Sequence, residues 1–202
     1  MQQPDPLELR PHTSIIVEEL LAELKGQKPP IGDLLARLRG RAYGLLLLVI
    51  SILSLIPGLS FIGGVIIIIF AAQMTIGRAV PLLPGIIARR RVPIAPVARY
   101  IGYVLPSLRF VERFVRPRLA IATIEPARAI AGIVLIGLGV TLFIPFPFSQ
   151  IAPALAASVV SIGLLERDGV AFLAGLVLSF AALLLSVWTA MIAWKTFVGV
   201  FG

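Results

Sequence analysis

The sequence predicts an all-α integral membrane protein, and three observations lead to that prediction. The 202-residue chain is 58% hydrophobic and only 14% charged, with a mean hydropathy of +1.01, which is too apolar for one water-soluble core of this size. A proline-broken apolar hairpin occurs twice, and a longer apolar stretch follows the second copy. We therefore interpret residues 1–202 as a single membrane domain.

Residues 1–43 are expected to form an amphipathic N-terminal region that lies on the membrane surface. One helix is predicted from Ser14 to Lys25, with leucines and isoleucine on one side and glutamates elsewhere. A second helix begins near Gly32 and carries arginines toward its end. The first forty residues contain several acids and no apolar signal core, so we expect no cleaved leader.

The two hairpins, residues 44–78 and 128–167, share one pattern. Each copy runs from an arginine through an apolar stretch to Ile-Pro, a serine, a second apolar stretch and another arginine. Matched positions are 87 to 89 residues apart, so the pattern is an internal repeat. The matched residues are Arg41, Pro57, Ser60 and Arg78 in the first copy, and Arg128, Pro145, Ser149 and Arg167 in the second.

The arms of the hairpins are short for a membrane crossing. Gly44–Ile56 reaches only about 20 Å, against a hydrocarbon core of about 30 Å. This favours re-entrant hairpins, and thin or tilted crossing helices fit the same lengths. Pro57, Pro145 and Pro147 are expected to break the helices and free backbone carbonyls, which lipid tolerates only where protein or a water-lined cavity covers them.

The sequence also predicts two further segments, a connector and a last membrane span. Residues 79–127 are predicted to be a basic interfacial connector, because their many prolines exclude one long helix and their arginines favour the membrane surface. Residues 170–195 are long and apolar enough to cross a membrane. This last span ends in Trp188, Trp194 and Lys195, which are typical of the membrane interface.

The distribution of basic residues predicts the orientation. Lysine and arginine are concentrated in residues 25–41 and 78–128, and such an excess marks cytoplasmic segments. Each hairpin then enters and returns on the cytoplasmic side. If Val97–Phe110 crossed the membrane instead, the two repeats would be inverted, as in many transporters. Charge favours the first topology and symmetry the second.

The polar side chains within the hairpins are candidate binding residues. Gln73 and Gln150 are the largest polar groups inside the apolar runs, and each needs hydrogen-bond partners in lipid. Either they join helices or they face a wet cavity. Ser60 and Ser149 stand beside the breaks, where freed carbonyls and a helix N-terminus would collect.

The four arginines that bracket the hairpins are the second candidate group. They are Arg41, Arg78, Arg128 and Arg167. Each one alone is most simply an anchor at the membrane surface. Brought together by the repeat, they would form a bidentate trap for phosphate or another anion.

Composition argues against several kinds of chemistry. With no cysteine and a single histidine, His12, no metal site or cofactor is expected. No serine has a visible base, so we expect no catalytic residue and no enzyme. The basic residues flank apolar segments, which favours membrane lipids over nucleic acid as partners. Small residues on the last span predict a contact face for a homo-oligomer; they are Ser179, Ala182, Ser186 and Ala190.

Several short motifs occur in the order expected for one known family. They are Arg41-Ala42-Tyr43-Gly44, Ile56-Pro57-Gly58, Gln73 with Gly77-Arg78, Pro81-Leu82-Leu83-Pro84, Glu112-Arg113 with Arg116-Pro117-Arg118-Leu119, Pro145-Phe146-Pro147-Phe148 followed by Pro153-Ala154, and Arg167-Asp168-Gly169. On these residues the chain resembles the ExoD family of bacterial exopolysaccharide-synthesis membrane proteins over nearly its whole length. Leu82 stands where that family tends to have tryptophan, and Gln150 where it tends to have asparagine.

The resemblance implies a bacterial inner-membrane protein, multi-pass, that supports exopolysaccharide production and is linked to alkaline tolerance. It implies no reaction. Our leading interpretation is a transporter or flippase-like protein for an anionic, lipid-linked phosphate carrier. One alternative is a structural or regulatory scaffold for polysaccharide synthases. Another is a proton- or cation-coupled exchanger, for which neither hairpin supplies a carboxylate within its apolar arms.

Overall fold

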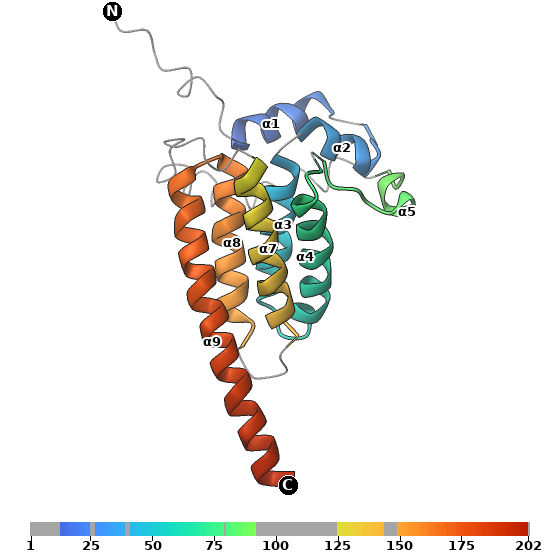
Figure 1. Cartoon of the computed structure of the whole chain (residues 1–202). Helices are drawn as coiled ribbons and strands as arrows, with labels where there is room; N and C mark the ends of the chain where they lie inside the picture. The colour runs from blue at the N-terminus through green and yellow to red at the C-terminus, as the bar shows by residue number, and fades with distance from the viewer. Residues whose placement is uncertain are drawn as a thin grey trace, which may run out of the picture.

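The computed structural model is all-helical in the residues that it describes, and five of its helices form a bundle (Figure 1). It describes residues 13–24, 27–38, 41–78, 80–91, 125–143 and 149–201. The helices are α1 (Thr13–Glu23), α2 (Ile31–Leu38), α3 (Ala42–Leu53), α4 (Leu59–Thr75), α5 (Gly85–Ala88), α7 (Glu125–Thr141), α8 (Ile151–Glu166) and α9 (Gly169–Phe201). His12, Val97–Phe110, Pro145 and Pro147 lie outside the described residues, so the predictions made for them stay predictions.

The predicted hairpins correspond to two helix pairs, α3 with α4 and α7 with α8. Pro57 lies in an exposed turn between α3 and α4, not inside a helix. The carbonyl of Leu53, four residues earlier, accepts a hydrogen bond from the N–H of Ile56 at 3.1 Å. Gly58 follows with φ at +89°, a conformation that glycine adopts without strain, and α4 begins. The expected cavity over a broken helix is therefore not needed at Pro57, because the turn satisfies that carbonyl itself.

Both hairpins open at the same end of the bundle. Gly44, at the start of α3, packs against Leu165 at the end of α8. Gly132, near the start of α7, packs against Ala71 and Thr75 near the end of α4. Helices α3 and α7 therefore run in the same direction, antiparallel to α4 and α8 (Figure 1). In the structure the two repeats are parallel, and the inverted arrangement is not the one observed.

The two repeats interlock instead of packing as separate hairpins. Gly44 and Gly132 are matched by the repeat, and each allows a close approach between helices of different hairpins. A Cβ atom on Gly44 would lie 2.7 Å from the backbone nitrogen of Leu165, and one on Gly132 would lie 2.7 Å from the carbonyl oxygen of Ala71. The closely packed pairs α3–α8 and α4–α7 are thus related by an approximate twofold axis along the bundle.

The interior of the bundle is filled by one cluster of apolar side chains. It includes fully buried residues from all five long helices, among them Leu47, Ile67, Leu135, Val160 and Phe172. Most buried hydroxyls of the described residues are satisfied locally, because the Oγ atoms of five serines donate to the carbonyl four residues earlier at 2.6 to 2.8 Å. These serines are Ser51, Ser54, Ser158, Ser161 and Ser179.

Helix α9 packs along α8 and then continues beyond the bundle (Figure 1). Gly163 lies beside Phe172 and Gly175 beside Val160, an antiparallel register that places the start of α8 near Leu184. The 33 residues of α9 rise about 50 Å, so its last part extends past the hairpin turns. Among the described helices, it is the one that is long and apolar enough to cross a membrane by length and composition.

The small residues of α9 face the protein's own bundle. Ser179, Ala182 and Ser186 are almost fully buried within this chain. The prediction that they form a face for contact with a second copy is therefore wrong, since α9 uses them to pack against its own neighbours.

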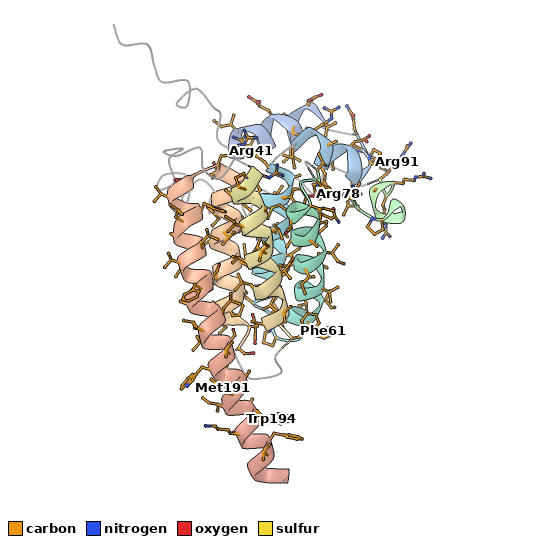
Figure 2. All side chains as sticks on the ribbon, in the orientation of Figure 1. Arg41, Phe61, Arg78, Arg91, Met191 and Trp194 are labelled. Carbon is orange, nitrogen blue, oxygen red and sulfur yellow. The ribbon has the colours of Figure 1, made fainter. Side chains whose placement is uncertain are left out.

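The outer surface of the bundle is apolar along its length. Exposed large side chains include Ile52, Phe61, Ile133, Leu155 and Val177, which come from all five long helices. Of the charged residues that the structure describes, all except Lys195 lie at the end where the hairpins open. Figure 2 shows this separation, with Arg41, Arg78 and Arg91 at one end and Phe61 at the other.

Candidate functional site

The four predicted arginines come together at one end of the bundle. Arg41 immediately precedes α3 and Arg128 lies in the first turn of α7, whereas Arg78 follows α4 and Arg167 follows α8. Because both hairpins open at this end, the repeat places all four residues there, and Figure 2 labels Arg41 and Arg78 among them. We call it the basic end, and the opposite end, with the turn at 54–58 and residues 142–143 and 149–150, the hairpin tips.

The side chain of Arg128 contacts both the backbone of Arg78 and the ring of a buried tyrosine. The Nη2 atom of Arg128 donates a hydrogen bond to the carbonyl oxygen of Arg78 at 3.3 Å. The guanidinium carbon of Arg128 lies 5.9 Å from the ring centroid of Tyr43, within range of a cation–π interaction. Arg78 is also close enough to interact electrostatically with the phenol. The basic end thus places two cations, one from each repeat, near one aromatic side chain.

The hydroxyl of Tyr43 is unusual for a buried polar group. The residue is only 1% exposed, and its oxygen has no hydrogen-bond partner within the described residues. Sequence reasoning did not single out Tyr43 as a site residue. A signal was present, since Tyr43 places a polar atom two residues after Arg41 at the start of an apolar run, where the second repeat has only small and aliphatic residues.

The corresponding end of the second repeat is built differently. Arg167 ends α8 in the left-handed conformation, with φ at 56°. Asp168 follows, and its Oδ1 atom accepts hydrogen bonds from the N–H groups of Val170 at 2.7 Å and Ala171 at 3.3 Å. The carboxylate therefore caps the N-terminus of α9, which also favours a negative charge. Asp168 thus has a structural role as a helix cap.

The helix ends also correct the predicted symmetry of the four arginines. Helix α4 ends with Gly77 in the left-handed conformation, and the N–H of Arg78 then donates to the carbonyl of Gln73 at 3.2 Å. Helix α8 ends with Arg167 in that same conformation, and the N–H of Asp168 donates to the carbonyl of Gly163 at 3.0 Å. Structurally, Arg78 therefore matches Asp168, and Arg167 matches Gly77. The predicted equivalence of Arg78 and Arg167 is therefore wrong, because the structure shifts the match between the two repeats by one residue at this end.

Gln73 is held by the protein's own backbone. Its Nε2 atom donates to the carbonyl of Leu82 at 3.1 Å, and its Oε1 atom accepts from the N–H of Leu82 at 2.6 Å. This pair of bonds fixes the segment after α4 to the last turn of that helix. Of the two interpretations that the sequence left open, the structure shows Gln73 joining two parts of the fold.

The remaining candidate residues lie at the hairpin tips. Ser60 is in the first turn of α4, Ser149 precedes Gln150, and Gln150 is buried at the start of α8 without a side-chain bond to cap that helix. The 17 residues of α4 separate Ser60 from the basic end by about 24 Å. The eight predicted binding residues therefore do not form one site, and the structure brings together only those at the basic end.

Short helices cover the basic end and add more cations. Helices α1 and α2 lie above the open ends of the hairpins, and α5 lies to the side, next to α2 (Figure 1). Arg37 of α2 pairs with Glu23 at 2.8 Å, and the N–H of Ile31 donates to the carbonyl of Arg90 at 3.2 Å. Within the described part of the chain, no three His, Asp or Glu side chains are grouped in a way that could hold a metal ion.

Comparison with known proteins gives a consistent assignment. The model of a family described as "Exopolysaccharide synthesis, ExoD" matches residues 13–188. An uncharacterised protein from Synechocystis sp. is 26% identical over 162 residues, which cover 78% of this chain and 76% of that protein. Protein ExoD from Rhizobium meliloti is 28% identical over 162 residues, which cover 74% of this chain and 65% of that protein. No solved structure matches the chain.

Proposed function

Because the chain belongs to the ExoD family of exopolysaccharide-synthesis proteins, we propose that it is a multi-pass inner-membrane protein whose basic end binds the phosphate of a lipid-linked carrier. Family membership supplies the link to exopolysaccharide synthesis, which builds on such carriers. The observation that carries the proposal is the convergence of Arg78 and Arg128 at the end of an otherwise apolar bundle. A planar guanidinium suits a phosphate because it can donate two parallel hydrogen bonds.

The exposed apolar surface supports the membrane location. Large hydrophobic side chains on all sides of a bundle are costly in water and favourable in lipid. About 20 residues of α9 span a hydrocarbon core of about 30 Å, so a crossing that starts at Gly169 ends near Trp188. Trp194 and Lys195 then lie in the headgroup region.

The rise per helical residue also gives the depth to which the hairpins enter the membrane. Helices α3, α4, α7 and α8 contain 12 to 17 residues and reach about 18 to 26 Å. In the proposed arrangement the hairpin tips therefore approach the far interface, and the bilayer is thinned around them. The basic end, with almost all described charges, faces the cytoplasm.

We further propose that binding leads to transfer of the carrier's headgroup across the membrane, as in a flippase, without chemical change. The lipid tails stay in the bilayer, so only the phosphate needs a path through the protein. That path requires the pair α4–α7 to part from α3 and α8, because apolar side chains fill the bundle interior. Cation exchange is less well supported, since the carboxylate of Asp168 serves as a helix cap.

The filled interior favours a second candidate function. A bundle whose core is one contiguous apolar cluster needs no moving parts to act as a scaffold for polysaccharide synthases. In that case the basic end would hold the protein at anionic lipid headgroups and would not transfer them. Binding without transfer is the outcome that identifies the scaffold.

The test uses purified full-length protein in liposomes that contain a fluorescent polyprenyl phosphate. We expect the wild-type chain to bind this lipid and to speed its movement between leaflets. Arg78→Lys keeps the charge but loses the planar guanidinium that donates two parallel hydrogen bonds, so the affinity for the lipid should fall about tenfold. Arg37→Lys is the matched control, because Arg37 belongs to an exposed ion pair on α2, outside the bundle.

The outcomes separate the two functions. Binding and transfer that fall together in Arg78→Lys support the flippase. Binding that is sensitive to Arg78→Lys, with no transfer by the wild type, supports the scaffold. Equal affinity of the wild type, Arg78→Lys and Arg37→Lys would overturn the proposed phosphate site.

A further inference from the structure

We propose that the hydroxyl of Tyr43 is the third donor of the phosphate site, and that Arg128 covers it when no ligand is bound. The proposal rests on the function proposed above and deepens it, because it assigns the headgroup oxygens to three named donors. These are the guanidinium groups of Arg78 and Arg128 and the phenol of Tyr43, which come from three different helices or helix ends.

The first step is that the Tyr43 hydroxyl lacks a partner where almost every other described hydroxyl has one. Buried polar atoms are normally hydrogen-bonded, since an unmet donor in an apolar environment is costly. Most serines and threonines of the bundle meet this need within their own helices, whereas the hydroxyl of Ser186 has no partner within the described residues. A tyrosine hydroxyl stands too far from its own backbone to do so. It therefore needs a partner from elsewhere.

The second step is the position of this hydroxyl. Helices α3 and α7 stand at opposite corners of the four-helix bundle, because each packs beside α4 and α8. Tyr43 of α3 nevertheless has the guanidinium of Arg128 from α7 over its ring, 5.9 Å from the centroid. The side chain therefore lies toward the axis at the basic end, beneath the guanidinium of Arg128 and within electrostatic range of Arg78. A phenol donor near two cations is suited to an oxyanion.

The third step is the role of Arg128. Its guanidinium is anchored to the carbonyl of Arg78 and lies over the ring of Tyr43, which is 1% exposed. A phosphate is charged, and it binds a guanidinium more strongly than an aromatic face or a neutral carbonyl does. Arg128 then leaves the ring, and the hydroxyl of Tyr43 donates to the same phosphate. The ligand thus opens the site that it occupies.

The two ligand sources share this chemistry. Free inorganic phosphate and the phosphate of a membrane lipid offer the same oxygens, so both are used as probes. Dodecyl phosphate in micelles of a neutral detergent represents the lipid headgroup, and inorganic phosphate represents the free ion. A site that takes the lipid binds dodecyl phosphate more tightly than inorganic phosphate.

The experiment compares Tyr43→Phe with Ser186→Ala in the full-length protein. Both variants remove a buried hydroxyl that has no hydrogen-bond partner within the described residues, and Ser186 lies on α9 away from the basic end. Removing such a hydroxyl should leave the melting temperature unchanged or raise it in both variants. We expect Tyr43→Phe to bind dodecyl phosphate about tenfold more weakly and Ser186→Ala to bind it like the wild type.

Three outcomes would contradict the proposal. If Tyr43→Phe binds like the wild type while Arg78→Lys binds weakly, the phosphate site stands and the role of Tyr43 is refuted. If Arg78→Lys also binds like the wild type, the proposed function itself fails. A melting temperature that falls by several degrees in Tyr43→Phe, but not in Ser186→Ala, would show that the hydroxyl has a structural partner and would refute the inference.

Discussion

The basic ends of the two repeats share a backbone and differ in chemistry. In both, a helix ends with a residue in the left-handed conformation, which is Gly77 in the first repeat and Arg167 in the second. Arg78 then projects from the first repeat into solvent, whereas Asp168 of the second repeat turns back to cap α9. Duplication has therefore given two equivalent helix ends, of which one is followed by the exposed Arg78 and the other by the cap of α9.

The same difference supports the phosphate site proposed at Arg78 and Arg128. Where α4 of the first repeat meets α7 of the second, Arg78, Arg128 and the unpartnered hydroxyl of Tyr43 lie close to one another. The second repeat's end has the buried acids Glu166 and Asp168 beside Arg167, and these lower the local positive charge. Anion binding is favoured where cations are not offset by nearby carboxylates. The two repeats thus share a fold but differ in how well their charges suit an anion.

The largest expected effect concerns the part that the two repeats share. Gly44→Ala and Gly132→Ala would each place a Cβ 2.7 Å from backbone atoms of another helix, so each should lower the free energy of unfolding by about 1–3 kcal/mol. Gly137→Ala is the control, because its Cβ would meet only the flexible end of Leu183 at 3.4 Å. The measurement is thermal unfolding of the purified protein. Stability that falls in one of the two glycine variants but not in the other would break the twofold relation between the repeats.

A smaller effect is expected where the repeats differ. Asp168→Ala removes the cap of α9 and should lower the free energy of unfolding by about 1 kcal/mol. Asp168→Asn keeps an oxygen that can accept the N–H of Val170, and should therefore stay close to the wild type. Affinity for dodecyl phosphate should not weaken in either variant. Weaker binding in Asp168→Ala, at full stability, would assign the second repeat's end to the ligand site.

Much of the architecture was predictable from the sequence. The apolar runs and the 87 to 89 residue offset predicted both helix pairs, because hydrophobic length and an internal repeat are local properties of the chain. Family membership also followed from short motifs, and the match over residues 13–188 confirms it. The long apolar helix at residues 170–195 is present and extends to Phe201.

The predictions that failed depended on which helices meet. Sequence alone could not show that α9 packs on α8, so Ser179 and Ser186 were assigned to a second copy when they face the protein's own bundle. The offset aligned Arg78 with Arg167, but the left-handed residue that ends each helix shifts that match by one. Tyr43 was overlooked because its lack of a partner is visible only in three dimensions.

The most direct test of the central claim is the location of a bound phosphate amphiphile. A photoreactive alkyl phosphate would be cross-linked to the full-length protein in liposomes, and the modified peptides would be identified by mass spectrometry. The account predicts labels at the start of α3, after α4 and at the start of α7, around Tyr43, Arg78 and Arg128, and their loss in the presence of excess dodecyl phosphate. Competed labels confined to the hairpin tips around Gln150, or to the α8–α9 junction at Arg167, would contradict it.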